Sequence, residues 1–282
     1  MTVHLSKLHG TGNDFLVMVP PDGVAADAAF ARAVCDRHRG IGADGLITLL
    51  PGVTGADCTM ELRNADGGIA EMSGNGIRCL AWVAVREGLG RSGTLVVDTG
   101  GGRRTLTLVV EGGHLRTATV DMGPVTFDPS AIPLDAPSAF DLEATFHGTT
   151  YLGDAAGMGN PHLVLLVDDV QAARVVQHGP HLEADARFPN RTNVEFIAPN
   201  AEGGIDMRVW ERGVGETLSC GTGACAAAAV AHRRGLVGAE TTVRVPGGEL
   251  SVTLGDSVLL GGPVVHVFDT EFDERGFTGS RV

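Results

Sequence analysis

An internal duplication constrains the fold of this 282-residue chain more than any other feature of its sequence. The stretch AEMSGNGIRCLAW, which contains Ser73, matches LSCGTGACAAAAV, which contains Cys220, and these two positions are 147 residues apart. The same spacing holds without a gap over about forty positions, which makes a chance match a poor explanation. Each copy reads as strand, Gly-rich turn, helix, strand, Gly-Gly turn and strand, so we predict two similar halves rather than a short-period solenoid.

The segments that follow Ser73 and Cys220 are expected to be central, buried helices. Residues 77–88 and 224–235 are apolar on nearly every side until their last turn. A helix that is apolar all round must be buried. The run of alanines in the second segment would let a surrounding sheet approach closely, and each segment ends with basic residues followed by glycine, a common helix stop.

The segments 93–123 and 241–262 alternate β-forming residues around Gly turns, which predicts antiparallel hairpins. We therefore predict an α+β fold of two pseudo-symmetric domains, each a curved, mostly antiparallel β-sheet or barrel around a central helix. We expect the N-terminal domain, with the first helix, to comprise residues 1–120 plus 266–282. The C-terminal domain, with the second helix, is expected to comprise residues 121–265.

Composition excludes several classes of function. The net charge of −13 argues against a nucleic-acid partner, because nucleic acids are polyanions. The N-terminus has no apolar segment typical of a signal peptide, and no apolar run approaches membrane-spanning length. Five cysteines without a regular framework indicate a reducing, cytoplasmic environment, and we expect Cys35 and Cys58 to be plain small apolar residues.

Ser73 and Cys220 each precede a Gly-polar-Gly turn at the expected start of a helix. The free N–H groups and the positive dipole end of a helix N-terminus bind anions, carboxylates included. The same field predicts that the pKa of Cys220 is depressed relative to that of an ordinary thiol. The alternatives are that Ser73 is an ordinary helix N-cap and that Cys220 is an inert buried cysteine. The matched pair favours a shared site.

Other familiar sites are not indicated. GTGNDF and GTGACA lack the full context of a dinucleotide-binding motif, and there is no P-loop motif. Cys220 and Cys225 are five residues apart and no Cys-x-x-Cys pair occurs, so we predict no metal site.

Six longer motifs closely resemble those of diaminopimelate epimerases, in the right order and over nearly the whole chain. They are LHGTGNDF (8–15), RHRGIGADGL (37–46), RNADGGIAEMSGNGIRC (63–79), GMGNPHLV (157–164), FPNRTNVEF (188–196) and ERGVGETLSCGTGAC (211–225). The resemblance implies an isomerase of lysine biosynthesis that converts LL-diaminopimelate to the meso form. It also implies a homodimer that works without a metal or pyridoxal phosphate, and a fold of two pseudo-symmetric domains, in agreement with the duplication.

In this family two cysteines act on opposite faces of the substrate α-carbon, one as base and one as acid. The resemblance places the catalytic groups at Cys220, Ser73, His162 and Glu211, where Glu211 would assist Cys220 and His162 would assist position 73. It places the contacts to the substrate at Asn13, Asn64, Gly74, Asn75, Asn160, Asn193, Glu211, Arg212, Gly221 and Thr222. The glycines and their neighbours would offer backbone N–H groups to the reacting carboxylate, while Asn64, Asn193 and Arg212 would hold the distal centre.

Each of these assignments has a simpler alternative. Glu211 and Arg212 could form a surface ion pair of little energetic value. His162 could be a core histidine with satisfied hydrogen bonds. The four asparagines lie beside Gly- or Pro-containing turns, where asparagine is common for conformational reasons. We favour the functional assignments because all of these residues occur together.

Ser73 departs from the family pattern, which has cysteine at this position. A hydroxyl is a far weaker acid than a thiol and becomes a base only when a partner activates it. A general acid–base group typically contributes about 10²–10⁴ in rate, so epimerisation should be slow or lost while binding persists.

Three explanations remain open for Ser73. The first is a deliberate Cys→Ser change that preserves every other motif. The second is a natural one-cysteine relative that acts on another amino acid, as some hydroxyproline epimerases and dehydratases do. The third is a non-catalytic amino-acid-binding protein.

Overall fold

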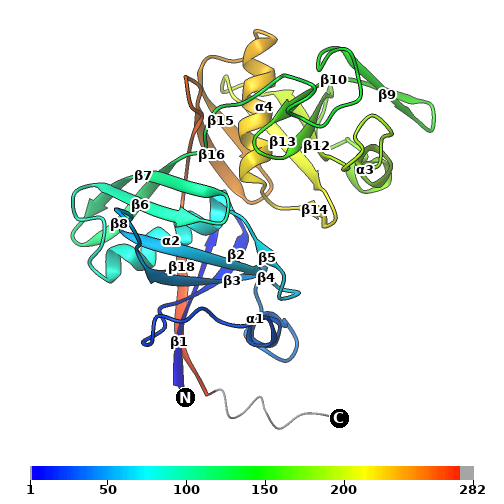
Figure 1. Ribbon diagram of the computed structural model, residues 1–282. Helices are drawn as coiled ribbons and strands as arrows, with labels where there is room; N and C mark the ends of the chain where they lie inside the picture. Colours follow the sequence, from blue (N-terminus) through cyan, green and yellow to red (C-terminus); the bar gives the residue numbers. More distant parts are fainter. Residues whose placement is uncertain (1, 274–282) are drawn as a thin grey trace. The chain divides into compact units, whose positions relative to one another are not determined.

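The computed structural model describes residues 2–273, which form two compact units (Figure 1). Unit 1 holds the described residues up to Val120 and from Gly262 onward, and unit 2 is Asp121–Gly261. The sequence analysis expected the chain to return from the second unit to the first after residue 265, whereas in the structure it returns after Gly261, four residues earlier. No described helix is both long and apolar enough to cross a membrane.

Unit 1 is a mixed sheet with the strand order β18-β1-β2-β3-β4-β6-β7-β8, and β5 pairs on β4. Its neighbouring strands are antiparallel except for β2/β3 and β4/β6. The elements are β1 (Thr2–Gly10), β2 (Asn13–Met18), α1 (Ala28–Cys35), β3 (Gly45–Pro51), β4 (Cys58–Asn64), β5 (Ile69–Ala70), α2 (Gly74–Arg86), β6 (Thr94–Thr99), β7 (Gly102–Glu111), β8 (His114–Asp121) and β18 (Val265–Asp273).

Unit 2 repeats this order as β9-β10-β11-β12-β13-β15-β16-β17, with β14 on β13. Its parallel neighbours are β11/β12 and β13/β15, at the places equivalent to those of unit 1. The elements are β9 (Leu142–Phe146), β10 (Thr149–Gly157), β11 (Pro161–Leu166), α3 (Val175–Glu183), β12 (Asn193–Pro199), β13 (Ile205–Glu211), β14 (Gly215–Thr217), α4 (Gly221–Arg233), β15 (Glu240–Val245), β16 (Gly248–Thr253) and β17 (Leu259–Gly262).

The duplication is confirmed and reaches further than the sequence match. Helix α4 begins and ends 147 residues after α2, and β13 stands at the same distance from β4. The spacing also relates β1 to β10 and the first residues of α1 and α3, where the sequences have few identities. The predicted hairpins are confirmed as β6-β7-β8 and β15-β16-β17.

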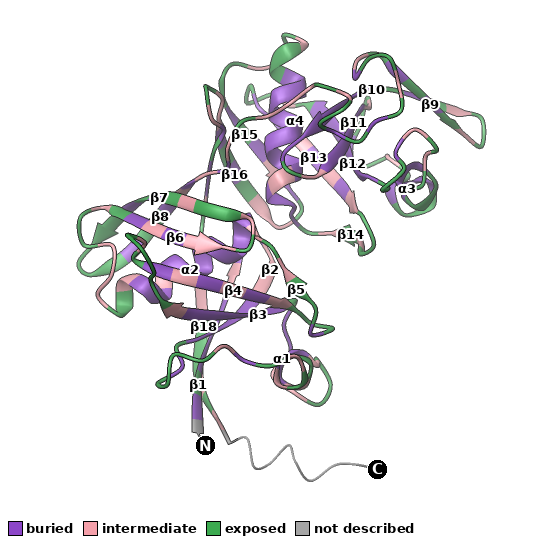
Figure 2. Cartoon of the chain, in the orientation of Figure 1, coloured by how far each residue is buried: buried purple, intermediate pink, exposed green. Residues whose placement is uncertain are grey.

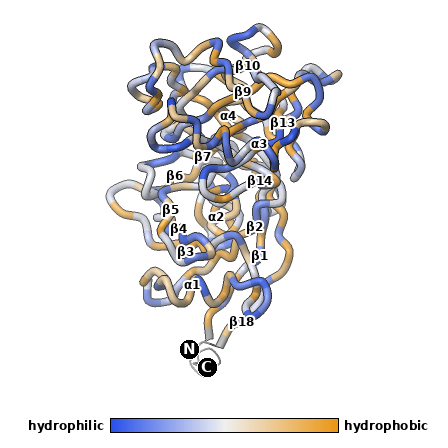
Figure 3. The backbone as a smooth tube through the Cα atoms, turned by 90° about the vertical axis from the view of Figure 1, so that its right-hand side faces the viewer, coloured by the Kyte–Doolittle hydropathy of each residue, from blue (hydrophilic) through white to orange (hydrophobic). Residues whose placement is uncertain are grey.

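The central helices are buried as their sequences predict (Figure 2). Ten residues of α4 are buried, including the whole alanine run, and α4 contacts strands β10 to β13, β15 and β16. Helix α2 contacts β1 to β4 and buries an equivalent face. Figure 3 colours the same helices by hydropathy. Each sheet thus wraps around one helix. Because the helix is buried, the position of its N-terminus is fixed relative to the strands of its own unit.

All five cysteines are free and buried. Burial raises the pKa of the Cys35 and Cys58 thiols to about 12, which fits their expected role as small apolar residues.

Candidate active site

Ser73 and Cys220 occupy the same backbone position and make the same local contact. Each is the N-cap of its helix with extended backbone, at φ −138° and ψ 124° for Ser73 and φ −124° and ψ 114° for Cys220. Ser73 Oγ accepts a hydrogen bond of 3.0 Å from Gly76 N, and Cys220 Sγ accepts one of 3.4 Å from Gly223 N. The N-cap reading of Ser73 is therefore correct, and Cys220 is a cap of the same geometry.

The two residues of each helix that follow the cap present the N–H groups of the first turn. Gly74 and Asn75 begin α2, and Gly221 and Thr222 begin α4. The first N–H groups of a helix have no intrahelical acceptor. Both helix ends thus have the local geometry that suits a bound carboxylate.

The environment of Cys220 differs from the sequence prediction. Burial raises its pKa well above that of an ordinary thiol, and the nearby carboxylates of Glu211 and Glu195 raise it further. The hydrogen bond from Gly223 and the contact with Thr222, whose hydroxyl lies 3.6 Å from Sγ, offset this only in part. The predicted depressed pKa was wrong, because it considered the helix end and not the burial of the thiol, which has the largest effect, or the two carboxylates that other strands bring to it.

Glu211 ends β13 beside the Cys220 helix end. Its Oε1 accepts a hydrogen bond from the hydroxyl of Thr217, and its carboxyl group also contacts Cys220. Burial raises the pKa of Glu211, and the charge of Glu195 acts in the same direction. A carboxyl group of raised pKa in contact with a thiol is suited to proton exchange with it.

His162 stands in a buried chain of hydrogen bonds in unit 2. Its Nδ1 lies 2.7 Å from Glu195 Oε1, and its Nε2 lies 2.9 Å from Asn160 Oδ1. The Asn160 amide continues the chain, because its Nδ2 lies 3.4 Å from Thr222 Oγ1. His162 is therefore linked to the first turn of α4.

Asn193 and Arg212 lie at the ends of β12 and β13. Asn193 accepts a hydrogen bond of 2.9 Å from Arg212 N and donates one of 3.0 Å to Pro161 O. The exposed Arg212 guanidinium donates to Asn190 O at 3.1 Å. Among the described contacts Glu211 pairs with Thr217 and not with Arg212, so the proposed surface ion pair between them is not formed.

In unit 1 the predicted asparagines divide into a pair and a single residue. Asn75 Nδ2 donates to Asn13 Oδ1 at 3.3 Å, and Asn13 donates to Asp44 Oδ2 at 2.7 Å. Asn64 is exposed at the end of β4, at the position equivalent to Glu211 in unit 2. Asn13 is likewise equivalent to Asn160.

The candidate residues other than Asn64 thus gather at the two helix ends. Unit 1 places Asn13 and Asn75 together at the end of α2 where Ser73 lies. Unit 2 groups its candidates around the start of α4 and the adjoining ends of β11, β12 and β13. These are Asn160, His162, Asn193, Glu211, Arg212, Cys220, Gly221 and Thr222.

Sequence reasoning missed two buried charged residues at these helix ends. Glu195 is fully buried in β12 and contacts His162. Arg78 is fully buried in α2, where it donates to Gly74 O at 2.9 Å and to Asn75 Oδ1 at 2.7 Å. An available signal was that each is the only charged residue in an otherwise uncharged segment of its motif, VEFIA and GNGIRCLAW.

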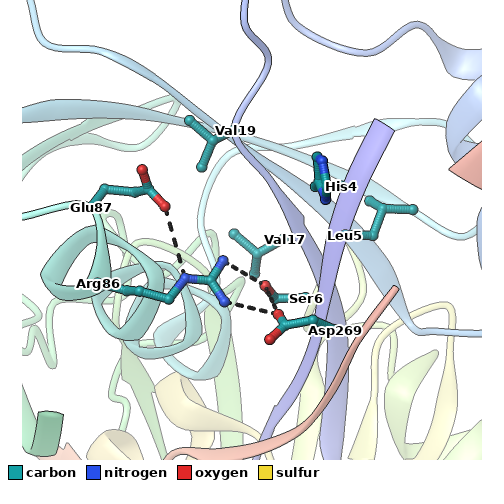
Figure 4. A pocket seen from close by; sticks show the side chains of 8 residues that line it. All are labelled: His4, Leu5, Ser6, Val17, Val19, Arg86, Glu87 and Asp269. Atoms are coloured by element: carbon teal, nitrogen blue, oxygen red, sulfur yellow. Dashed lines mark hydrogen bonds and ion pairs between the residues drawn. The ribbon is translucent and has the colours of Figure 1, made fainter. Parts of the chain in front are cut away.

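A cavity of about 530 Å³ in unit 1, lined by residues that include Arg86 and Asp269, is not part of this site (Figure 4). Arg86 crosses it, donating to Asp269 Oδ1 at 2.8 Å and to Ser6 Oγ at 2.9 Å. Arg86 ends α2, whereas Ser73 precedes its first residue. The thirteen residues of this helix separate the two places by about 20 Å, at about 1.5 Å per residue.

Comparison with solved structures supports the fold. The chain resembles a hydroxyproline epimerase from Agrobacterium vitis with a TM-score of 0.72 and 18% identity, over 98% of this chain and 94% of that one. It resembles a protein of the phenazine biosynthesis PhzF family from Bacillus anthracis with a TM-score of 0.72 and 15% identity, over 96% and 99%. At these identities the likeness concerns the fold alone.

Comparison of sequences identifies the family. The profile of the diaminopimelate epimerases matches residues 5–127 and 155–266. A diaminopimelate epimerase from Pelotomaculum thermopropionicum is 40% identical over 97% of this chain and 100% of its own length. One from Moorella thermoacetica is 42% identical over 96% and 99%. The matched helix ends, the buried acid–base groups and these relatives together place the chain in the diaminopimelate epimerase family.

Proposed function

We propose that this chain carries the site of a diaminopimelate epimerase with one competent thiol, Cys220, and a hydroxyl, Ser73, in place of the second. The observation that carries the proposal is the matched N-cap geometry of these two residues, which differ in the side-chain atom that exchanges protons. The natural reaction of such a site interconverts LL- and meso-diaminopimelate, a step of lysine biosynthesis.

In the proposed reaction one group removes the α-proton from one face of the substrate carbon while another delivers a proton to the opposite face. Cys220 removes or delivers the proton on one face of the α-carbon, and Glu211 exchanges a proton with the Cys220 thiol. Residue 73 serves the other face with the help of His162. The N–H groups of the first helical turns stabilise the carboxylate and the negative charge that develops as the proton leaves. This assignment requires no group beyond these side chains and helix ends.

The Ser73 hydroxyl is too weak an acid to serve its face at a useful rate. A positioned general acid or base contributes about 10²–10⁴ in rate, so its loss reduces epimerisation by a factor of this order or more. Substrate binding depends on backbone N–H groups and amides, and it is retained. The distal amino-acid group of the substrate is assigned to Asn64, the last residue of β4, to Asn193, the first residue of β12, and to Arg212, which follows the last residue of β13.

The experiment compares this chain and its Ser73→Cys variant with LL- and meso-diaminopimelate in D₂O, following α-proton exchange and isomer composition by NMR. We expect the variant to interconvert the isomers and the Ser73 chain to give little or one-sided exchange. Cys220→Ser in the variant background is the matched control and removes the activity again.

Each other outcome contradicts a stated part of the proposal. Interconversion by the Ser73 chain itself contradicts the need for two thiols. If neither form binds or converts diaminopimelate, the assignment of diaminopimelate as the substrate is contradicted. Epimerisation of trans-4-hydroxyproline by the Ser73 chain favours the alternative of a one-cysteine enzyme, the class to which the structural neighbour from Agrobacterium vitis belongs by name. Binding without turnover by both forms favours a non-catalytic amino-acid-binding protein.

We also propose a cytoplasmic homodimer. Support for the cytoplasm comes from the five free thiols, which suit a reducing environment. Support for self-association comes from β18, where the apolar side chains of Val265, Val267 and Phe268 are 44%, 52% and 41% exposed.

A further inference from the structure

Glu195 is a buried carboxylate in a strand that is otherwise uncharged. It has no exposed surface and stands between the buried Val194 and Phe196 in β12. Its Oε1 faces His162 Nδ1, and its Oε2 is buried without a hydrogen bond from any described residue. Because an isolated buried carboxylate is strongly disfavoured, the His162 ring is the group that compensates its charge.

The duplication shows that the fold does not need a carboxylate at this position. Glu195 pairs with Val209 across β12 and β13, and Ile47 pairs with Leu62 across the equivalent strands of unit 1. His162 is likewise equivalent to Phe15. Unit 1 therefore packs two apolar side chains where unit 2 has a carboxylate and an imidazole.

The carboxylate reaches the turn that carries Cys220. A Cβ atom added to Gly223 would lie 2.6 Å from Glu195 Oε1, so glycine is needed here to admit the carboxylate. In unit 1 a Cβ atom added to Gly76 would lie 3.1 Å from Ile47 Cδ1, which confirms that Ile47 is the equivalent residue.

Both nitrogens of the His162 ring face acceptors. Glu195 Oε1 lies at Nδ1, and Asn160 Oδ1 lies at Nε2 while the Asn160 amide nitrogen is directed to Thr222. Each ring nitrogen therefore has an acceptor within hydrogen-bond distance, and a ring that donates to both would be an imidazolium.

We propose that Glu195 is a positioning residue of the active site, which holds His162 as an imidazolium in one ring orientation beside the start of α4. Glu195 acts through His162 and does not touch the substrate. The inference rests on the proposed function, because it concerns the acid–base role assigned to His162.

The test replaces Glu195 by Gln, a residue of nearly the same shape without the charge. In the Ser73→Cys background we expect Glu195→Gln to lower kcat about 10–100-fold and to leave KM unchanged. A loss of this size is typical when a residue that orients a functional histidine is replaced. In the Ser73 chain at neutral pH, ¹⁵N NMR of His162 should show both ring nitrogens protonated. With Glu195→Gln it should show one.

The matched control is Tyr151→Phe. The hydroxyl of Tyr151 lies 2.7 Å from Nδ1 of His178, so this variant also removes a buried hydrogen bond to a histidine of unit 2. It should leave kcat, KM and the His162 resonances unchanged. An equal loss of kcat in the control would mean that Glu195 has a structural role only, and would overturn the inference.

The remaining outcomes separate the inference from the proposed function. Unchanged kcat and unchanged ring protonation in Glu195→Gln overturn the inference and leave the epimerase intact. Inactivity of Ser73→Cys counts against the proposed function, while the ¹⁵N spectra of the Ser73 chain still decide the role of Glu195. If Glu195→Gln does not fold, the Ser73 chain alone decides, because a ring protonated at one nitrogen overturns the inference.

Discussion

At the scale of single residues, the N-caps Ser73 and Cys220 differ in one side-chain atom, oxygen or sulfur. The charged side chains near the two helix ends also differ. Cys220 shares its end of α4 with the carboxylates of Glu211 and Glu195. The first turn of α2, which follows Ser73, is bonded to the guanidinium of Arg78. A proton is therefore held more firmly at Cys220 than its place at a helix N-terminus alone indicates, because burial of the thiol and two nearby negative charges oppose its loss.

This environment predicts the alkylation of Cys220. Burial and the carboxylates raise its pKa, so the thiol form dominates at neutral pH and iodoacetamide should react slowly, with a rate that rises as the solution is made alkaline. Glu211→Gln removes a charge that opposes the thiolate and should lower the pKa. Each unit of decrease multiplies the thiolate population at neutral pH about tenfold. Mass spectrometry of the labelled peptide measures this rate.

The other four cysteines serve as internal controls, because their burial should keep them unlabelled in the folded chain. Rapid alkylation of Cys220 at neutral pH, unaffected by Glu211→Gln, would contradict the assignment of these carboxylates as the cause of the raised pKa.

The sequence predicted which candidate residues lie together better than it predicted their electrostatics. Cys220, Glu211 and His162 were placed at the site by family resemblance, and the structure brings them together around one helix end. Glu195 was overlooked because its contact with His162 joins residues 33 apart in the sequence. The motif that contains Glu195 does not show which residue it contacts. The predicted direction of the Cys220 pKa was wrong mainly because the sequence analysis left out the burial of the thiol, and also because it left out the charges of Glu211 and Glu195.

At the scale of elements, unit 2 has His162 and Glu195 at the positions equivalent to Phe15 and Ile47 of unit 1. We therefore predict that substitutions of His162 and Glu195 have non-additive effects on the free energy of unfolding. His162→Phe alone leaves the Glu195 carboxylate buried and unpaired, and breaking a buried pair in this way costs about 3–5 kcal/mol of unfolding free energy. Adding Glu195→Ile removes the unpaired charge and should recover most of the loss. Urea unfolding of the two single variants and the double variant measures the coupling.

The control for this cycle is Tyr151→Phe combined with Glu195→Ile, because Tyr151 bonds to His178 and not to His162 or Glu195. Its effects should simply add. Additive effects in the His162 and Glu195 pair as well would show that the two side chains do not depend on one another.

The elements predicted with success are those with an unambiguous local pattern. The alanine run of α4 cannot lie at a surface, and the Gly turns of β6 to β8 fix the hairpins. The equivalence of α1 with α3 was not found, because their sequences AAFARAVC and VVQHGPHLE have diverged while their place in the fold is kept. Structural equivalence outlasts side-chain identity where only burial is required.

At the scale of the whole molecule, the two units differ in how the chain builds them. Unit 2 is one continuous segment with its own core around Tyr151, Leu163 and Phe196. Unit 1 is discontinuous, because β18 returns after unit 2 to pair with β1 along nearly its full length. The edge of β1 is therefore unpaired in any chain that lacks β18.

This difference predicts the behaviour of fragments. Residues 121–261 expressed alone should unfold cooperatively in urea, since the strand pairs that order the sheet of unit 2 lie within this segment. Residues 1–120 should aggregate or remain only partly folded, because the exposed edge of β1 invites pairing with other chains. Adding a peptide of residues 262–273 should restore cooperative unfolding, which circular dichroism measures. A fragment 1–120 that folds without the peptide would contradict this expectation.

The position of β18 also sets a time order for the synthesis of the protein. Every residue of unit 2 must be translated between the last residue of the first part of unit 1 and the strand that completes it. At about 5–20 residues per second, the ribosome takes about 8–30 seconds to cover the residues from 120 to 273. During this interval the edge of β1 that pairs with β18 is unpaired, while unit 2 is already complete and able to fold. Strand β1 is therefore exposed to pairing with other chains for most of the synthesis of the protein.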